Sequence, residues 1–405
     1  MGRYSLETAA DRAGVEPGEI ARLTELGILS NDAGYSDADV RRLQVARALE
    51  RAGLELESLA DLLQEGSVSL RFLDEAGSTV FAALSDVTFA ELSERSGVPL
   101  EMLTLLREVT GGQAPRPGER VREDELEILP LVSYQVELGF RGDAIERALR
   151  VYGDSLRRVA EAEAEWWRSE VQAPLLERGV HADELGHRAA EISPRLSRAT
   201  DRALVAIYHA QQMHVWSANI VDGITAALEQ AGMHTRDEQQ PAMCFLDLTG
   251  FTQLTQELGD AEAARTIERT NRIVRPISVR HDGLPVKWLG DGVMFHFPDP
   301  GAGVLGAIEM VEALADAELP PAHVGLHAGP VVRQEGDYHG QTVNLAARIG
   351  EFARPGEVLV SRAVKEASDP ELVTFQEIGR VDLKGISGAV ELYTATSTSG
   401  RRSSH

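Results

Sequence analysis

The sequence predicts an all-α region of about 230 residues followed by an α+β domain. Before residue 230, apolar residues recur at helical spacing, as in PGEIARLTELGIL and RALVAIYHAQQMHVWSANI, with glycines between the helices. A polar segment ending in proline, HTRDEQQP (234–241), has the composition of a linker. From there to residue 397, short runs rich in strand formers alternate with helical stretches: MCFLDL, VKWLG, VMFHF, HVGLHAG, EVLVS and VELYTAT.

The overall composition limits the number of domains and the cellular location to be expected. A chain of 405 residues with 43% hydrophobic residues predicts two to four ordinary packed domains. No apolar run approaches 18 residues, and MGRYSLETAADRAG lacks the apolar core of a secretory signal. Cys244 is the only cysteine, in a context that predicts strand packing. We therefore predict a cytoplasmic chain without a transmembrane segment.

Residues 1–75 predict a module of small helices. Ser36 has the position of an N-cap, and two helices follow it, separated at Gly53. A weaker copy follows. The stretch AADRAGV (9–15) matches LSERSGV (92–98) at an offset of 83, and Gly53-Leu54 matches Gly139-Phe140 at an offset of 86. The pattern predicts a second helical module, at the start of a regulatory domain over 86–233.

The rest of that domain predicts long helices with breaks at Pro174 and Pro194. Histidine titrates near neutrality, so a pH-dependent switch is one interpretation of the histidines that precede the catalytic part; ordinary surface histidines are the other. These histidines are His181, His187, His209, His214 and His234.

The first strand of the α+β domain carries an acid. Asp247 interrupts the apolar run MCFLDL, where a carboxylate is costly to bury unless it is paired or binds a cation. The bend Thr249-Gly250-Phe251 leads into a helix whose first amides suit phosphate oxygens. The alternative is that Asp247 caps this helix.

A hairpin, VKWLGDGVMF, supplies a second acid. Asp291 lies at its tip, and two acids on neighbouring strand ends can hold two divalent metal ions. The alternative is a turn residue in a Gly-Asp-Gly hairpin. Lys287 lies four residues earlier, roughly 13 Å along an extended strand, and needs a different partner unless it is an edge lysine that reaches solvent.

The third polar group lies on a predicted helix within QTVNLAARI. Asn344 and Arg348 are four residues apart and so share one face, and Asp337 precedes the helix by a short loop. A guanidinium is a planar fork for phosphate, and an amide both donates and accepts. The alternative is a pair of ordinary surface residues.

Together these stretches, with VDLKGISG near the C-terminus, resemble the catalytic domain of class III nucleotidyl cyclases over residues 241–397. The resemblance implies a ferredoxin-like core with extra strands. It implies a homodimer whose sites lie at the interface, with both aspartates from one chain and the remaining groups from its partner. It also implies two divalent metal ions per site, Mg²⁺ or Mn²⁺.

The resemblance gives each position a role. Asp247, Asp291 and the Leu248 carbonyl match the metal ligands. Lys287 and Asp337 match the residues that select the purine. Asn344 and Arg348 match the ribose-orienting and transition-state residues. Lys384 matches a polyphosphate contact, beside the bend Thr249, Gly250 and Phe251.

The predicted base is adenine. Lys287 only donates hydrogen bonds and an ionised Asp337 only accepts them. This pair complements the N1 acceptor and the 6-amino donor of adenine, whereas guanine reverses that edge. We therefore predict an adenylate cyclase that takes ATP. Guanylate and diguanylate cyclases are the alternatives, although diguanylate cyclases usually have a Gly-Gly-Asp/Glu-Glu-Phe turn where this chain has Leu289-Gly290-Asp291-Gly292.

The N-terminal module resembles the winged helix-turn-helix of MerR-type regulators. Residues 1–75 carry 8 Arg, no Lys and 15 Asp plus Glu, a net charge of −7 in a chain of −24, so binding to nucleic acid is not expected. Residues 86–230, especially RVYGDSLRRVAEAEAEW, resemble the regulatory segment of actinobacterial cyclases. This predicts control by residues 1–240, with a proton or a small molecule as candidate signals, and a disordered tail over 398–405. The alternative function is a DNA-binding or protein-binding regulator with a cyclase-like domain that senses nucleotide without catalysis.

Overall fold

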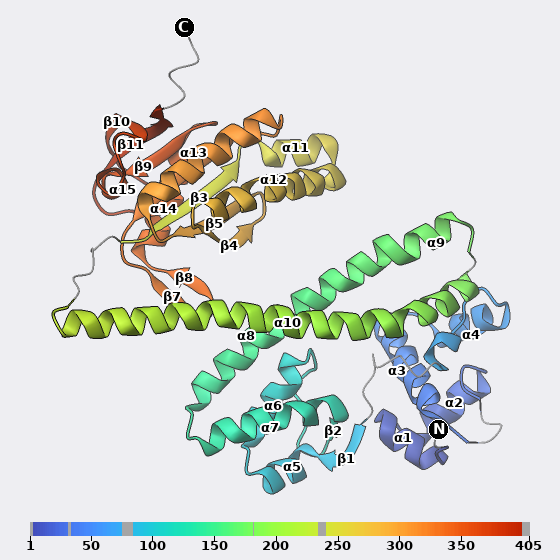
Figure 1. Ribbon diagram of the computed structural model, residues 1–405. Coiled ribbons are helices and arrows are strands. Elements are labelled where there is room, and N and C mark those ends of the chain that lie inside the picture. The colour runs from blue at the N-terminus through green and yellow to red at the C-terminus, as the bar shows by residue number, and fades with distance from the viewer. Residues whose placement is uncertain (1–2, 31–33, 75–83, 181, 234–239, 399–405) are drawn as a thin grey trace. The chain divides into compact units, whose positions relative to one another are not determined.

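The computed structural model (Figure 1) describes residues 3–30, 34–74, 84–180, 182–233 and 240–398. Most of the predicted linker, 234–241, and of the predicted tail, 398–405, lies outside these ranges. The chain divides into two compact units, Met1–Gly223 and Ile224–His405, which are described in turn. Within the described ranges, no helix combines the length and the apolar character that crossing a bilayer requires.

The first unit contains two helical modules and a long helical extension. The elements of the first module are α1 (Leu6–Ala13), α2 (Pro17–Glu25), α3 (Asp37–Arg51), α4 (Leu56–Gln64) and a 3-10 turn (Arg71–Asp74). Those of the second are β1 (Leu84–Thr88), α5 (Phe89–Ser96), α6 (Leu100–Val109), β2 (Arg120–Arg122), α7 (Glu123–Glu137) and α8 (Gly142–Trp167). After a π-helical turn (Arg168–Gln172) come α9 (Ala173–Glu177) and α10 (Ala182–Gln230).

The two modules share one plan, as the sequence offsets predicted. Gly14 and Gly97, 83 residues apart, both cap a first helix in the left-handed conformation that favours glycine. Asp39 and Glu125, 86 residues apart, are buried acids in the first turn of the third helix, each paired with an arginine of its own module. In each module a short antiparallel pairing joins the chain before the first helix to the chain before the third.

The helix boundaries differ from the prediction at one proline. Ser36 caps α3 with a reciprocal capping box, which confirms the predicted N-cap. The break predicted at Pro194 is wrong, because α10 continues through that residue. At Pro174 the helix instead loosens into the π turn just before the proline and ends at Glu177, since proline cannot donate a backbone hydrogen bond to the preceding turn.

The second unit is built on a seven-stranded sheet in the order β10-β11-β9-β6-β3-β5-β4. Its central part, β6-β3-β5-β4, has the order of a ferredoxin-like βαββαβ fold, so the predicted α+β class is confirmed. The elements are β3 (Ala242–Leu248), α11 (Phe251–Leu258), α12 (Asp260–Arg280), β4 (Leu284–Leu289), β5 (Gly292–Phe297), α13 (Pro300–Asp316), β6 (Ala322–Ala328), β7 (Val332–Gln334), β8 (Asp337–His339), α14 (Gln341–Phe352), β9 (Val358–Ser361), α15 (Arg362–Glu366), β10 (Val373–Val381) and β11 (Val390–Ser397).

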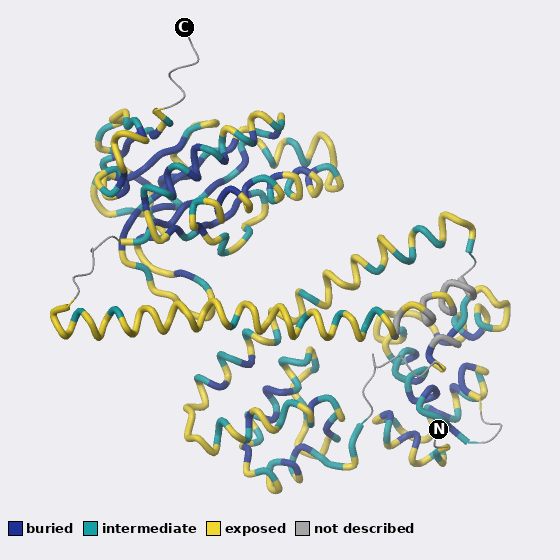
Figure 2. The backbone as a smooth tube through the Cα atoms, in the orientation of Figure 1, coloured by how far each residue is buried: buried dark blue, intermediate teal, exposed yellow. Residues whose placement is uncertain are grey.

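Strand β3 is buried on both faces, as the dark blue strands of Figure 2 show. Cys244, Leu246 and Leu248 point into the main core, which includes residues of α12 and α13. Met243 and Phe245 point to the other face, toward Ala346 of α14. Because side chains alternate along a strand, Asp247 also lies on the α14 face. Cys244 is fully buried as a free thiol, so its predicted packing role is confirmed.

Helix α14 lies against the sheet through a contact that only glycine permits. A Cβ atom on Gly325 of β6 would lie 2.0 Å from the backbone nitrogen of Gly350 and 2.6 Å from the Ala346 carbonyl oxygen. On the α14 side of the same contact there is room for a side chain, since a Cβ on Gly350 would make ordinary contacts of 3.5 Å or more. The position of α14 therefore depends on the absence of a side chain at Gly325.

We predict that Gly325→Ala destabilises the protein by about 1–3 kcal/mol, because the new methyl group displaces backbone that cannot relax alone. Gly350→Ala is the matched control across the same contact. It should be neutral or stabilise by up to about 1 kcal/mol, since alanine favours a helix. Urea denaturation of both variants measures the difference, and equal stabilities would contradict the proposed packing constraint.

Candidate active site

Two predicted metal-binding acids lie side by side at the end of β3. The antiparallel pairing of β3 with β5 places Leu246 opposite Val293, so Asp247 lies beside the hairpin turn. A Cβ on Gly292 would lie 2.7 Å from an Asp247 carboxylate oxygen, so a side chain at position 292 would displace this carboxylate from its position. Gly290, not Asp291, takes the positive φ of the turn, at 69°. The turn conformation therefore does not account for an aspartate at 291.

The electrostatics of this corner favour a cation. Burial, then Asp291 and then Glu351 raise the pKa of Asp247 to about 6. His323 of β6 is directly opposite Asp247 in the sheet, with its Nε2 3.7 Å from a carboxylate oxygen. Burial lowers the pKa of His323, which keeps the imidazole neutral near pH 7.

The donor set fits a hard divalent ion. Among the described residues no group of three or more His, Cys, Asp or Glu side chains is arranged to hold a metal. Mg²⁺ commonly takes one or two carboxylates and completes its shell with substrate phosphates and water. Asp247 and Asp291 supply such a pair. The side chain of Leu248 is in the core, so only its backbone carbonyl is available as a further ligand.

The predicted purine-selecting residues form an ion pair. Lys287 Nζ donates to Asp337 although 50 residues separate them, and Asp337 also accepts from the Tyr338 N–H at 2.8 Å. Partial burial opposes ionisation, but these hydrogen bonds lower the pKa of Asp337 below its ordinary value. The register of β4 against β5 shifts between Pro285 and Lys287, and such an irregularity re-aims the side chains that follow it.

Asn344 and Arg348 line an open cavity of about 1030 Å³ beside α14. Arg348 pairs with Glu351 of the same helix at 2.5 Å, and Asn344 is exposed. Other residues of the wall are His327, His339, Thr342, Glu351 and Ser387. Such a cavity, with an arginine and an amide on one helix face, has the size and the donors for a nucleotide.

The predicted phosphate contacts differ in availability. The Thr249 N–H already donates to the Pro321 carbonyl at 2.9 Å, whereas its hydroxyl is buried without a hydrogen-bond partner in the described part of the chain. Gly250 starts α11 in the left-handed conformation, and Phe251 packs against the main core. Lys384 is exposed in the turn after Leu383, beside Gly385 of the cavity wall.

The predicted residues form three groups within one chain. Asp247 and Asp291 form the first, Lys287 and Asp337 the second, and Asn344 with Arg348 the third. Among the described residues, no hydrogen bond or ion pair joins the first group to the other two. The sequence analysis missed two neighbours of Asp247, namely His323 and Glu351. Only the pairing of β6 with β3 and the packing of α14 bring them there.

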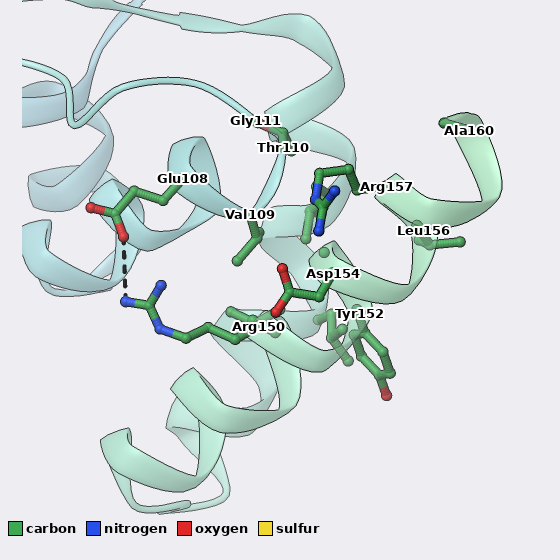
Figure 3. Close-up of a pocket in the computed structure, with 14 residues that line it drawn as sticks. Glu108, Val109, Thr110, Gly111, Arg150, Tyr152, Asp154, Leu156, Arg157 and Ala160 are labelled. Carbon is green, nitrogen blue, oxygen red and sulfur yellow. Dashed lines mark hydrogen bonds and ion pairs between the residues drawn. The ribbon is translucent and has the colours of Figure 1, made fainter. Parts of the chain in front are cut away.

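The helical unit contains a separate cavity of about 660 Å³ between α6, α7 and α8 (Figure 3). Its wall is mostly apolar, and Arg150 at its rim pairs with Glu108 at 3.4 Å. Asp154 and Arg157 also line it, and Arg157 pairs with Glu161 on the next turn of α8.

Comparison with known proteins relates the C-terminal part of the chain to one enzyme family. Residues 233–397 match the family model of the adenylate and guanylate cyclase catalytic domain. The C-terminal part of the chain is therefore similar to this catalytic domain, and we call residues 241–397 the cyclase domain after that match. It contains all three groups of predicted site residues, and the predicted enzyme class is confirmed at this level.

The similarity to individual cyclases extends beyond this domain. The chain is 28% identical over 315 residues to a pH-sensitive adenylate cyclase of Mycobacterium tuberculosis, covering 76% of this chain and 77% of that protein. It is 24% identical to an adenylate cyclase of Streptomyces coelicolor, covering 68% and 70%. A solved structure that it matches is the adenylyl cyclase CyaB of P. aeruginosa, at 23% identity and a TM-score of 0.36, over 40% of this chain and 95% of that one.

The raised pKa of Asp247 in the cyclase domain predicts pH-dependent metal affinity. A carboxyl group with a pKa of about 6 is increasingly protonated below that pH, and a metal ion must displace the proton. We expect the affinity for Mn²⁺, measured by electron paramagnetic resonance without nucleotide, to fall about tenfold per pH unit below pH 6 and to be nearly constant above pH 7. In Glu351→Gln the fall should begin at a lower pH, because one of the three causes of the raised pKa is removed. An affinity independent of pH between 5 and 7 would contradict this account.

Proposed function

We propose that the protein is an adenylate cyclase that converts ATP to 3′,5′-cyclic AMP and pyrophosphate at a site shared by two subunits. The observation that carries the proposal is the Lys287–Asp337 ion pair within a cyclase domain. It holds one donor and one acceptor side by side, and these complement the adenine edge when Lys287 faces N1 and Asp337 faces the 6-amino group. A good pair of such contacts discriminates between bases by about 1–3 kcal/mol. The relatives named adenylate cyclase are consistent with this choice.

In the proposed reaction the 3′-oxygen of the ribose bonds to the α-phosphorus, and the bond from that phosphorus to the bridging oxygen breaks as pyrophosphate leaves. Bound Mg²⁺ or Mn²⁺, two per site, would neutralise the phosphates and lower the pKa of the 3′-hydroxyl. Asp247, Asp291 and the Leu248 carbonyl would hold these ions. The acceptor of the hydroxyl proton is water or a substrate phosphate, since none of the predicted site residues is placed as a general base.

The remaining groups orient the substrate. Asn344 positions the ribose. Arg348 leaves its ion pair with Glu351 and contacts the phosphoryl group, where negative charge increases during the reaction. Lys384 and the hydroxyl of Thr249, with the start of α11 at Gly250 and Phe251, are assigned to the polyphosphate. The similarity to cyclases, together with the lack of a hydrogen bond or ion pair between the acids and the other two groups in the described part of the chain, supports a homodimer in which one protomer supplies the acids and its partner the rest.

The direct test is incubation with Mn²⁺-ATP. We expect cyclic AMP from the wild-type protein, at least about fivefold less product from GTP, and none from Asp291→Ala. Product from GTP alone would overturn the choice of base. No product from either nucleotide, with intact DNA binding in a mobility-shift assay, would favour the regulatory alternative.

Mixed subunits provide the control for a shared site. Asp291→Ala and Arg348→Ala remove groups from opposite halves of the site. An equal mixture after subunit exchange should regain about a quarter of wild-type activity, because half of the dimers are mixed and each has one intact site of two. Failure of the mixture, while both variants still dimerise, would mean that each site lies within one chain.

We further propose that the N-terminal unit controls the enzyme. Alignment with the pH-sensitive relative covers 315 residues, more than the 165 residues of 233–397, so part of this unit is shared with that protein. The cavity of Figure 3 is the volume in this unit that a regulatory small molecule would occupy. His209 and His214 are exposed on α10 and accessible to protons, whereas His181 and His234 lie outside the described residues and the side chain of His187 is not described. Residues 1–75, which resemble MerR-type regulators, are proposed to be a protein-binding module.

Removal of residues 1–240 tests this control. If the N-terminal unit holds the dimer in a less active state, residues 241–405 should turn over faster per dimer than the full chain, because a site split across an interface is sensitive to small rotations. Turnover is compared at protein concentrations where light scattering shows both proteins as dimers. Equal turnover would remove the proposal of inhibition.

A further inference from the structure

Asp337, one of the two predicted purine-selecting residues, is part of an exposed hairpin. Strands β7 and β8 form this hairpin, which extends away from the seven-stranded sheet (Figure 1). Its turn consists of Glu335 and Gly336, which both have positive φ, at 55° and 80°. Such a two-residue turn fixes the pairing of Gln334 with Asp337. The position of Asp337 therefore depends on what holds the hairpin against the rest of the domain.

One side chain anchors the hairpin. Of residues 332–339, all of which the structure describes, Tyr338 alone is buried, at 8% exposure, whereas Val332 is 60% exposed. The Tyr338 ring packs into an apolar cluster with Met243, Met294 and Ala346. A hairpin held by a single buried side chain opens easily, because little apolar area is lost when it detaches.

His296 of β5 supports this anchor. Its ring stacks on the Tyr338 ring, with the centroids 4.5 Å apart and the planes inclined by 14°. Burial and then Arg333 lower the pKa of His296, so the imidazole is neutral near pH 7 and stacks as an uncharged ring. The stack therefore adds a ring contact to the apolar packing of Tyr338.

Strand β5 also positions the second purine-selecting residue. Lys287 of β4 pairs with Met294 of β5, and His296 follows Met294 by two residues. Paired residues and residues two apart share one face of a sheet, so Lys287 and His296 lie on the same face. Tyr338 stacks on His296, and the preceding residue, Asp337, pairs with Lys287. The stack and the ion pair thus hold the hairpin at two adjacent residues.

Each carboxylate oxygen of Asp337 accepts one hydrogen bond. Oδ2 accepts from Lys287 Nζ, and Oδ1 accepts from the Tyr338 N–H at 2.8 Å. When adenine binds as proposed, Lys287 also has to donate to N1, whereas the Tyr338 N–H belongs to the backbone and moves only with the hairpin. The backbone at Tyr338 is therefore the contact that keeps Asp337 in place while it accepts from the 6-amino group.

We propose that His296 is a positioning residue for base selection: its stack on Tyr338 fixes the hairpin, so that Asp337 meets the 6-amino group of adenine in an already ordered position. This role rests on the preference for adenine proposed above. Without the stack, the contact with adenine has to order the hairpin, and that cost reduces the preference for ATP. A stack of two rings changes an equilibrium by about two- to tenfold.

Binding of nucleotides that cannot cyclise tests this role. The analogues 3′-deoxy-ATP and 3′-deoxy-GTP lack the attacking hydroxyl, and calorimetry with Mn²⁺ gives the ratio of their dissociation constants for the whole chain. His296→Ala should reduce the preference for 3′-deoxy-ATP by about two- to tenfold and leave the affinity for 3′-deoxy-GTP unchanged. His296→Phe should keep the parent ratio, because it retains a flat ring at the same position.

His281→Ala is the matched control. It removes another partly buried histidine of the same domain, one that pairs with Glu309 of α13 and not with the hairpin. This variant should keep the parent ratio.

Hydrogen exchange gives a second readout without nucleotide. Amide exchange over residues 332–339, measured by mass spectrometry, reports how often the hairpin opens. It should be about two- to tenfold faster in His296→Ala and unchanged in His296→Phe and His281→Ala.

The variants separate this role from the proposed function. A parent ratio retained by His296→Ala would overturn the role of His296, as would equal losses in His296→Ala and His296→Phe. A parent protein with no preference for the adenine analogue would reject the proposed base, and with it the role of His296 in selecting it. A preference that is lost in His296→Ala, in a protein that forms no cyclic AMP, would reject the enzyme and support the role of His296.

Discussion

Two carboxylates held together at one corner of a sheet are the feature on which the proposed chemistry of this protein depends. The pairing of β3 with β5 brings Asp247 beside the hairpin that carries Asp291, and partial burial keeps water from screening their repulsion. Asp247 responds with a raised pKa. A divalent cation would relieve this repulsion, which supports the metal site proposed here.

The rest of the cyclase domain maintains this corner. Gly292 leaves the space that the Asp247 carboxylate occupies, and Gly325 lets α14 lie directly on the neighbouring strand. Because α14 carries Asn344 and Arg348, the same close contact sets the position of the groups proposed to act on the substrate. The hairpin carries residues of two groups of the proposed site, with Asp291 at its tip and Lys287, paired to Asp337, on its first strand.

The two units differ in whether their acidic side chains are paired with arginines. In the helical modules the buried acids Asp39 and Glu125 are neutralised by arginines, as in stable structural cores. In the cyclase domain the acids of the corner have no such partner among the described residues, and Arg348 pairs only with an acid of its own helix. Acids without a cationic partner among the described residues mark the proposed site of catalysis.

The sequence by itself determined whatever depends on neighbours within a few residues. The cap at Ser36, the turn at Gly290, the face shared by Asn344 and Arg348, and the offset between the helical modules all follow from local periods and turn chemistry. The alternation of strand-forming and helical runs predicted the α+β class, and the resemblance to class III cyclases implied its ferredoxin-like core. The sequence analysis missed strand β10 because it is an edge strand with one buried residue, Val373, and its other residues partly or fully exposed, which leaves a weak apolar pattern.

Only the tertiary structure decided which distant residues meet. Lys287 and Asp337 are 50 residues apart, and His323 reaches Asp247 through the order of strands in the sheet. The continuation of α10 through Pro194 was equally hidden, since its effect depends on whether the surrounding helix tolerates one missing hydrogen bond. Local spacing fixes which side chains share a face, but contacts between faces depend on chain topology, which no short motif contains.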